Sequence, residues 1–124
     1  MMAWHEPKRK SQSFINRTGD VPESWEFNER LTRMVNDALY FCRARINADT
    51  RVHVYIRSGK EGNYGRCFWN SGIIVVRNRE GDHTIIHTLA HEVAHMAYHS
   101  HGKRHKELTD KILRYWKVKE DALS

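Results

Sequence analysis

Residues 83–105 read HTIIHTLAHEVAHMAYHSHGKRH and hold seven of the nine histidines in the chain. On an α-helix each residue advances by about 100°, so His87, His91 and His95 share one polar sector. The apolar side chains fill the opposite arc: Ile85, Ile86, Leu89, Val93, Met96 and Ala97. The pattern therefore predicts a helix that buries one side in a core and presents imidazoles on the other side.

Within this predicted helix, residues 91–95 have the pattern H-E-x-x-H. Imidazoles four residues apart on a helix stand about 6 Å apart along its axis, so His91 and His95 can bind one Zn²⁺. Catalytic zinc commonly takes three protein ligands and a water, so a third ligand must come from outside this pair. We choose His101, because the Gly102 after it lets the chain leave the helix and turn back toward the metal.

Other histidines, and another kind of helix, compete with this choice. His99 lies on the same helix and would be crowded beside His95, and His105 is better placed to support or line the site than to bind the metal. Both remain open as third ligands. A surface helix that is merely rich in histidine is the structural alternative, but it does not explain the apolar opposite face.

Glu92 gives the expected site its chemistry. A carboxylate beside the first ligand has no use in a purely structural zinc site. In metal-assisted hydrolysis it takes a proton from the water that attacks a peptide carbonyl, and then passes that proton to the leaving nitrogen. Tyr98, Tyr64 and His105 are candidates to line the site or to stabilise the oxyanion, and the sequence does not rank them.

Around this helix the chain predicts an α+β fold in one domain, since 124 residues suit a single core. Apolar residues at intervals of three and four predict a helix from Pro22 to about Ile46, and alternating residues predict a strand over 52–57. A hairpin over 66–77 and a last helix from about Lys103 complete the elements. The sheet is expected to have three or four strands.

The charge and the hydropathy of the chain limit the classes of partner and the cellular locations that we expect. Lysine and arginine number 21 against 15 acidic residues, which gives a net charge of +6 and favours polyanionic partners such as nucleic acid. The apolar runs are far shorter than the roughly 20 residues that cross a bilayer, and no secretory signal is readable. We expect a basic arm (1–21), one domain (22–119) and a short tail (120–124), in the cytoplasm, or in the nucleoid or nucleus if the protein associates with DNA.

Four stretches, taken together and in this order, resemble the SprT-like metallopeptidase domain: GRCFWN (65–70), IIVV (73–76), HTLAHEVAH (87–95) and HGKRH (101–105). The resemblance covers roughly residues 22–117, and related WLM and YgjP-like domains share the histidine helix. It implies a zincin-like fold with an N-terminal helix, a small sheet, the metal helix and a C-terminal helix. It also implies that His91, His95 and His101 bind zinc and that Glu92 is catalytic. The family includes Spartan-type proteases, which degrade proteins crosslinked to DNA.

The expected function is that of a zinc-dependent metallopeptidase acting on a protein or peptide substrate, and the resemblance implies DNA-associated targets. The alternatives are a nucleic-acid-binding domain and a zinc-stabilised interaction domain without peptidase activity. For nucleic acid, the candidate contacts are Lys103, Arg104, Lys106 and Trp69. The strand 73–77 has two interpretations: a sheet edge that holds an extended peptide by main-chain hydrogen bonds, or a buried strand. No membrane partner is expected.

Overall fold

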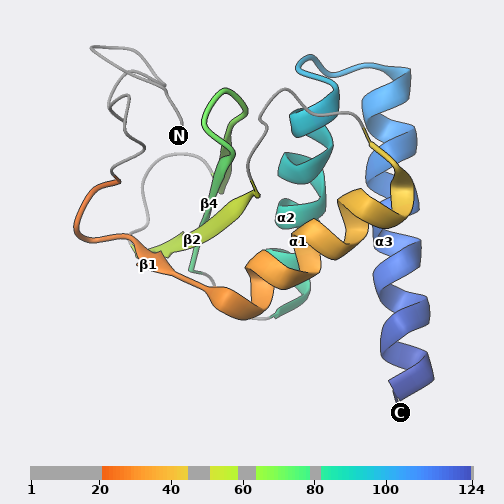
Figure 1. Ribbon diagram of the computed structural model, residues 1–124, viewed down its shortest axis with the longest axis horizontal. Helices are drawn as coiled ribbons and strands as arrows, with labels where there is room; N and C mark the ends of the chain where they lie inside the picture. The colour runs from red at the N-terminus through yellow and green to blue at the C-terminus, as the bar shows by residue number, and fades with distance from the viewer. Residues whose placement is uncertain (1–20, 45–50, 59–63, 79–81, 124) are drawn as a thin grey trace.

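The computed structural model describes residues 21–44, 51–58, 64–78 and 82–123. Figure 1 shows helices gathered on one side of a small sheet, which confirms the predicted α+β class. In chain order the elements are β1 (Glu26–Phe27), α1 (Glu29–Cys42), β2 (His53–Arg57), β3 (Gly65–Phe68), β4 (Ile73–Arg77), α2 (Asp82–Ala97) and α3 (Lys103–Leu123). Of the expected basic arm, only Val21 lies within the described residues.

The four described strands form a mixed sheet in the order β1-β2-β4-β3. β2 and β4 run parallel, whereas β3 and β4 form the predicted antiparallel hairpin. β4 therefore lies inside the sheet, and all five of its residues are buried. The interpretation of residues 73–77 as a sheet edge is wrong, because β3 occupies that edge.

Helix α1 begins at Glu29, later than the Pro22 start that the apolar spacing predicts. The two residues of β1 pair with β2 instead, so strand pairing wins over helix formation there. Asn28 then caps the helix, because its Oδ1 accepts a hydrogen bond from the N–H of Leu31 at 2.8 Å. The helix ends at Cys42, and the C-cap residue Arg43 has a left-handed φ of 52°. The predicted end near Ile46 lies outside the described residues.

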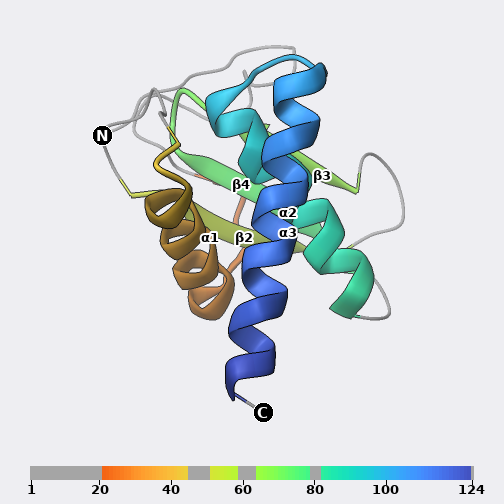
Figure 2. The same cartoon turned by 90° about the vertical axis from the view of Figure 1, so that its right-hand side faces the viewer.

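Helix α2 lies at the centre of the fold, between the sheet and α3 (Figure 2). Its apolar side chains Leu89, Val93 and Met96 are fully buried. They belong to one core cluster that also includes Val35 of α1 and Ile112 of α3. Since burial of this apolar stripe fixes which side of α2 faces the core, the histidines emerge on the remaining side.

Helix α3 closes the fold and extends past it. The Trp116 Nε1–H donates to the carbonyl oxygen of Met34 at 3.1 Å, and the Tyr115 hydroxyl donates to Asp37 at 2.8 Å. These bonds fix α3 against α1, while its C-terminal turns project beyond the other helices in both views. None of the described helices combines the length and the apolar character needed to cross a membrane.

Candidate metal centre

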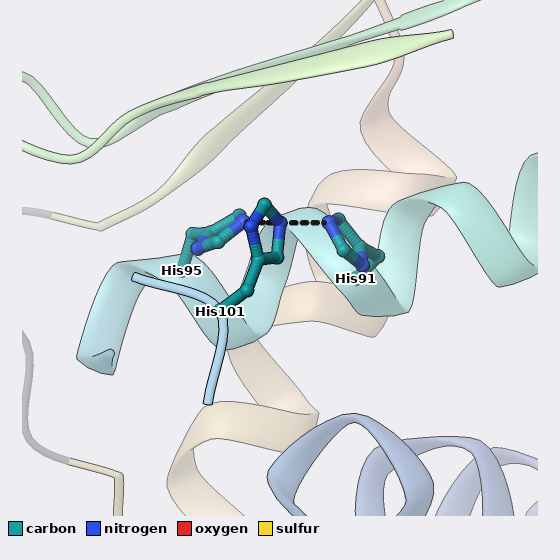
Figure 3. A group of neighbouring side chains, drawn as sticks. All are labelled: His91, His95 and His101. Carbon is teal, nitrogen blue, oxygen red and sulfur yellow. Dashed lines mark hydrogen bonds between the residues drawn. The ribbon is translucent and has the colours of Figure 1, made fainter. Parts of the chain in front are cut away.

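Helix α2 carries His91 and His95 on successive turns, and the connection to α3 carries His101. Figure 3 shows the three side chains pointing toward one another. His101 Nε2 lies 3.1 Å from His91 Nε2 and 3.2 Å from His95 Nε2. One ring nitrogen of each residue lies within 4.8 Å of the other two. The structure thus brings together the three histidines that the sequence names as metal ligands.

The chain reaches this arrangement by a route that differs from the predicted one. Among the described glycines, Gly72 has a positive φ and Gly102 does not. The carbonyl oxygen of Gly102 instead accepts a hydrogen bond from the N–H of Lys106 at 3.0 Å. Gly102 thus lacks the left-handed conformation of a glycine that ends a helix, so that part of the expectation is wrong, and the connection 98–102 between α2 and α3 carries the reversal.

The protonation of the rings shows why this cluster suits a cation. His95 Nδ1 lies 3.0 Å from the carbonyl oxygen of Tyr98. Since a carbonyl only accepts, Nδ1 carries the ring proton and His95 Nε2 is a bare acceptor. His101 Nε2 has at most one proton, which cannot fully satisfy both neighbouring rings. A tetrahedral zinc with Zn–N bonds of about 2.1 Å satisfies all three nitrogens and needs N···N separations of about 3.4 Å, close to the two short separations here.

Glu92 lines the same pocket as the triad and has only 8% of its surface exposed. Burial raises the pKa of its carboxyl from 4.5 to about 7, against an opposing effect of the Arg66 guanidinium. A carboxyl with this pKa can accept and release a proton near neutral pH. The structure therefore places a group suited to proton transfer beside the three histidines.

Gly65, at the start of β3, makes room for Glu92. A β-carbon at position 65 would lie 2.7 Å from Thr88 Cγ2 and 3.0 Å from Glu92 Cγ, too close for an ordinary contact. The missing side chain thus lets the edge strand pack directly on the face of α2 that carries Glu92. Sequence reasoning missed this role, because it depends on a contact between residues far apart in the chain.

The triad and Glu92 open into a pocket of about 730 Å³ between α2 and β3, which we call the histidine pocket. Tyr64, Arg66 and Trp69 line it from the β3 side, and His87 and Thr88 line it from α2. A pocket of this size is typical of ligand and substrate sites. It leaves room for part of a substrate beside the ring nitrogens.

Comparison with protein families agrees with this geometry. The model of the IrrE N-terminal-like domain, a peptidase family, matches residues 48–122, more than half of the chain, including all three histidines. This chain belongs to the IrrE N-terminal-like family. The family is zinc-metallopeptidase-like. The sequence-based expectation of a metallopeptidase-like domain therefore holds, as does that of a histidine triad that can hold a metal. Comparisons with curated proteins and with solved structures gave no match.

In this IrrE N-terminal-like domain, His105 supports the triad from α3 instead of joining it. Its side chain is buried, and its Nε2–H donates to the carbonyl oxygen of His91 at 3.0 Å. Its ring centroid lies 4.1 Å from that of His95 and 4.6 Å from that of His91. Burial and the neighbouring imidazoles lower the pKa of His91 to about 4, and burial lowers the pKa of His95 and His105. These pKa shifts favour the neutral form of His91 and His95, the form that binds a metal.

The remaining candidates lie in different places. His99 stacks on Trp69, with ring centroids 3.9 Å apart and planes inclined by 8°, and it lines the histidine pocket outside the triad. Tyr64 also lines this pocket and is half exposed. Tyr98 instead lines a second pocket, at the ends of α1 and α2 and the start of α3, and its contribution to the triad is the carbonyl oxygen that holds His95. Of the two tyrosines, Tyr64 is the one that lines the histidine pocket.

The four candidate nucleic-acid contacts are not gathered at one site. Trp69 lines the histidine pocket, whereas Arg104 lines the second pocket. Lys106 forms an ion pair with Asp110 at 3.4 Å, and Lys103 is exposed at the start of α3. The structure therefore does not combine the aromatic ring and the three cations in one pocket.

Proposed function

We propose that this protein is a zinc-dependent peptidase in which Glu92 transfers protons during hydrolysis of a peptide bond. The observation that carries the proposal is the convergence of three imidazole nitrogens beside a buried carboxyl in one pocket. The family supports a metallopeptidase-like class, and the reaction itself is our proposal. When bound, zinc supplies Lewis acidity, which activates water and polarises a peptide carbonyl.

The chain's own groups hold the metal and move the proton. The Tyr98 carbonyl fixes the His95 tautomer with Nδ1 protonated, which leaves Nε2 free to bind. The Glu92 carboxylate takes a proton from water as the water oxygen bonds to the carbonyl carbon. It then gives that proton to the amide nitrogen as the C–N bond breaks, so a carboxylic acid and an amine leave. The raised pKa of Glu92 suits both transfers.

We place an extended substrate segment along the edge of β3 that pairs with none of the described strands. The carbonyl oxygen of Tyr64 accepts a hydrogen bond from the N–H of Arg77, which continues the ladder between β3 and β4. Because main-chain groups alternate along a strand, those of Gly65 and Cys67 face away from β4. Both residues line the histidine pocket. This arrangement supports a substrate that adds to the sheet as a strand, with its scissile bond beside Glu92.

The test combines metal content with cleavage of a loosely folded basic protein. Wild-type protein should hold about one zinc per chain and cleave this substrate. Glu92→Gln should keep the zinc and lose at least about 100-fold of the activity, because only proton transfer is removed. His101→Ala should lose both. If zinc-loaded wild type cleaves no faster than Glu92→Gln, the peptidase proposal fails and a zinc-stabilised interaction domain takes its place.

Cleavage of DNA-associated proteins is a finer proposal. The net charge of +6 and the SprT-like resemblance support it. In the same assay single-stranded DNA should stimulate cleavage, and DNA binding should weaken steeply as the salt concentration rises. Cleavage that does not respond to DNA would indicate a general peptidase instead.

A further inference from the structure

The second pocket lies where the end of α1, the end of α2 and the start of α3 meet. It has a volume of about 600 Å³ and shares no lining residue with the histidine pocket. Four charged residues line it: Arg43, Arg104, Glu107 and Lys111. A pocket of this size can hold a small organic ligand. The proposed peptidase reaction makes no use of it.

Within the described part of the chain, the cations of this pocket lack acidic partners. Three other lysines of α3 have one: Lys106 with Asp110, Lys117 with Asp121 and Lys119 with Asp37. In contrast, Arg43, Arg104 and Lys111 form no ion pair with any described residue. Glu107 precedes Lys111 by four residues, a spacing that favours a helical ion pair, yet the two do not pair. The lining thus has an excess of two positive charges that the described side chains do not neutralise.

Tyr98 joins this pocket to the metal centre. Tyr98 lines the second pocket, and its carbonyl oxygen accepts the Nδ1–H of His95 at 3.0 Å. A ligand that contacts Tyr98 in this pocket therefore touches the same residue whose carbonyl orients His95. Loss of a group that orients a metal-binding imidazole typically changes metal affinity about 10- to 100-fold. Restraint at Tyr98 is thus a physical route from the second pocket to the triad.

We propose that the second pocket binds a small phosphate monoester, and that this binding tightens metal binding at the triad through Tyr98. Arginine binds phosphate oxygens in a bidentate fashion, and Arg43 and Arg104 supply two guanidinium groups. A phosphate dianion balances the positive excess. The Glu107 carboxylate can accept a hydrogen bond from a hydroxyl group of the ester. The metal part of the inference rests on the proposed zinc site, whereas the phosphate part does not.

The phosphate part is tested by calorimetry on metal-free protein, with inorganic phosphate and glycerol 3-phosphate as probes at constant ionic strength. One site per chain is expected, and the ester should bind more tightly than the free ion because it also reaches Glu107. Arg104→Gln/Lys111→Gln should weaken binding at least tenfold. The matched control, Lys106→Gln/Lys117→Gln, removes the same charge from the same helix outside the pocket and should leave binding within twofold. No binding, or an equal loss in both double variants, overturns the proposal.

The coupling is tested by measuring zinc affinity with a competing chromophoric chelator, with and without saturating glycerol 3-phosphate. The Arg104→Gln/Lys111→Gln variant, measured in the same buffers, corrects for zinc held by the ester itself. Wild type should bind zinc 3- to 10-fold more tightly with the ester, and zinc should tighten ester binding by the same factor. Tyr98→Ala keeps the carbonyl and removes the ring, so its ratio should fall to about onefold. The coupling is overturned if the ratio of zinc affinities with and without the ester is the same in wild type, in Arg104→Gln/Lys111→Gln and in Tyr98→Ala. The metal-free titration still decides the phosphate site if the peptidase proposal fails.

Discussion

The Glu92 carboxyl can act as a base only after it loses its proton. Its burial, however, favours the protonated form. Burial raises the pKa of Glu92 to about 7, whereas in the unfolded chain it ionises near 4.5. The folded state therefore holds this proton more tightly than the unfolded state. It follows that this residue makes the metal-free protein less stable as the pH rises from 4.5 through about 7.

Glu92→Gln should therefore stabilise the metal-free protein at pH 8, by about 1–3 kcal/mol, because the buried charge is removed. The advantage should shrink at pH 5, where wild-type Glu92 is already protonated when folded. Urea unfolding of both proteins in the presence of a chelator at the two pH values measures this difference. The histidine pKa shifts are common to both proteins and cancel. A gain that is the same at pH 5 and pH 8 would contradict the burial argument.

A second residue-scale prediction concerns the contact between Gly65 and Glu92. Gly65→Ala should destabilise the protein by about 1–3 kcal/mol, because the new β-carbon overlaps Thr88 and Glu92. Gly102→Ala is the matched control: a β-carbon there meets no atom within 4 Å, and the change should stay within about 0.5 kcal/mol. Denaturant unfolding compares the two. Equal effects at both positions would show that the close packing at Gly65 is not the cause.

At the scale of elements, the metal centre depends on how α3 docks on α2. His105 lies in the first turns of α3, yet it hydrogen-bonds to the main chain of α2 and packs against the rings of His91 and His95. The Thr109 hydroxyl donates to the His105 carbonyl oxygen at 2.8 Å within α3. Helix α2 thus carries two of the three triad histidines, and a side chain from α3 supports their rings.

We therefore expect His105→Ala to weaken zinc binding by about 10- to 100-fold, as the loss of a group that orients metal ligands typically does. His105→Phe keeps the ring packing without the hydrogen bond, so its zinc affinity should lie between those of wild type and His105→Ala. Trp116→Phe is the control, since Trp116 fixes α3 to α1 and its loss should lower stability without changing zinc affinity. Competition with a metal chelator measures the affinities. Unchanged zinc affinity in His105→Ala would remove His105 from the support of the site.

At the scale of the whole molecule, one metal ion would join α2 to the connection that leads into α3. If zinc binds the folded chain and not the unfolded chain, a free concentration of about 100 times its Kd adds about 2.7 kcal/mol of stability. For a domain of this size we expect the melting temperature to rise by about 10 °C. Thermal scans with and without zinc measure the shift.

Two variants separate the triad from its surroundings in this experiment. His101→Ala should lose most of the shift in melting temperature, because it removes one of the three ligands. His87→Ala should keep the full shift, because His87 lines the histidine pocket outside the triad. Shifts of the same size in His101→Ala and in wild type would place the metal elsewhere.

The sequence by itself determined the parts that depend on local periodicity. The spacing of apolar and polar residues on one helix sets which side of α2 is buried, and this places His91 and His95 on the free side at a separation that one metal can bridge. The same periodicity failed at the start of α1, where residues 26 and 27 pair with β2. The spacing of apolar residues along the chain carries no information about which strand a segment pairs with.

Tertiary structure alone decided the rest. That β3 is the edge strand follows from strand pairing, and that Gly65 must lack a side chain follows from a contact with α2. The pKa of Glu92 follows from burial by residues distant in sequence. Tyr98 lines the second pocket while its carbonyl oxygen holds His95, and this double position likewise needs three helices in place. Each of these features comes from atoms that only folding brings together, and no local spacing encodes them.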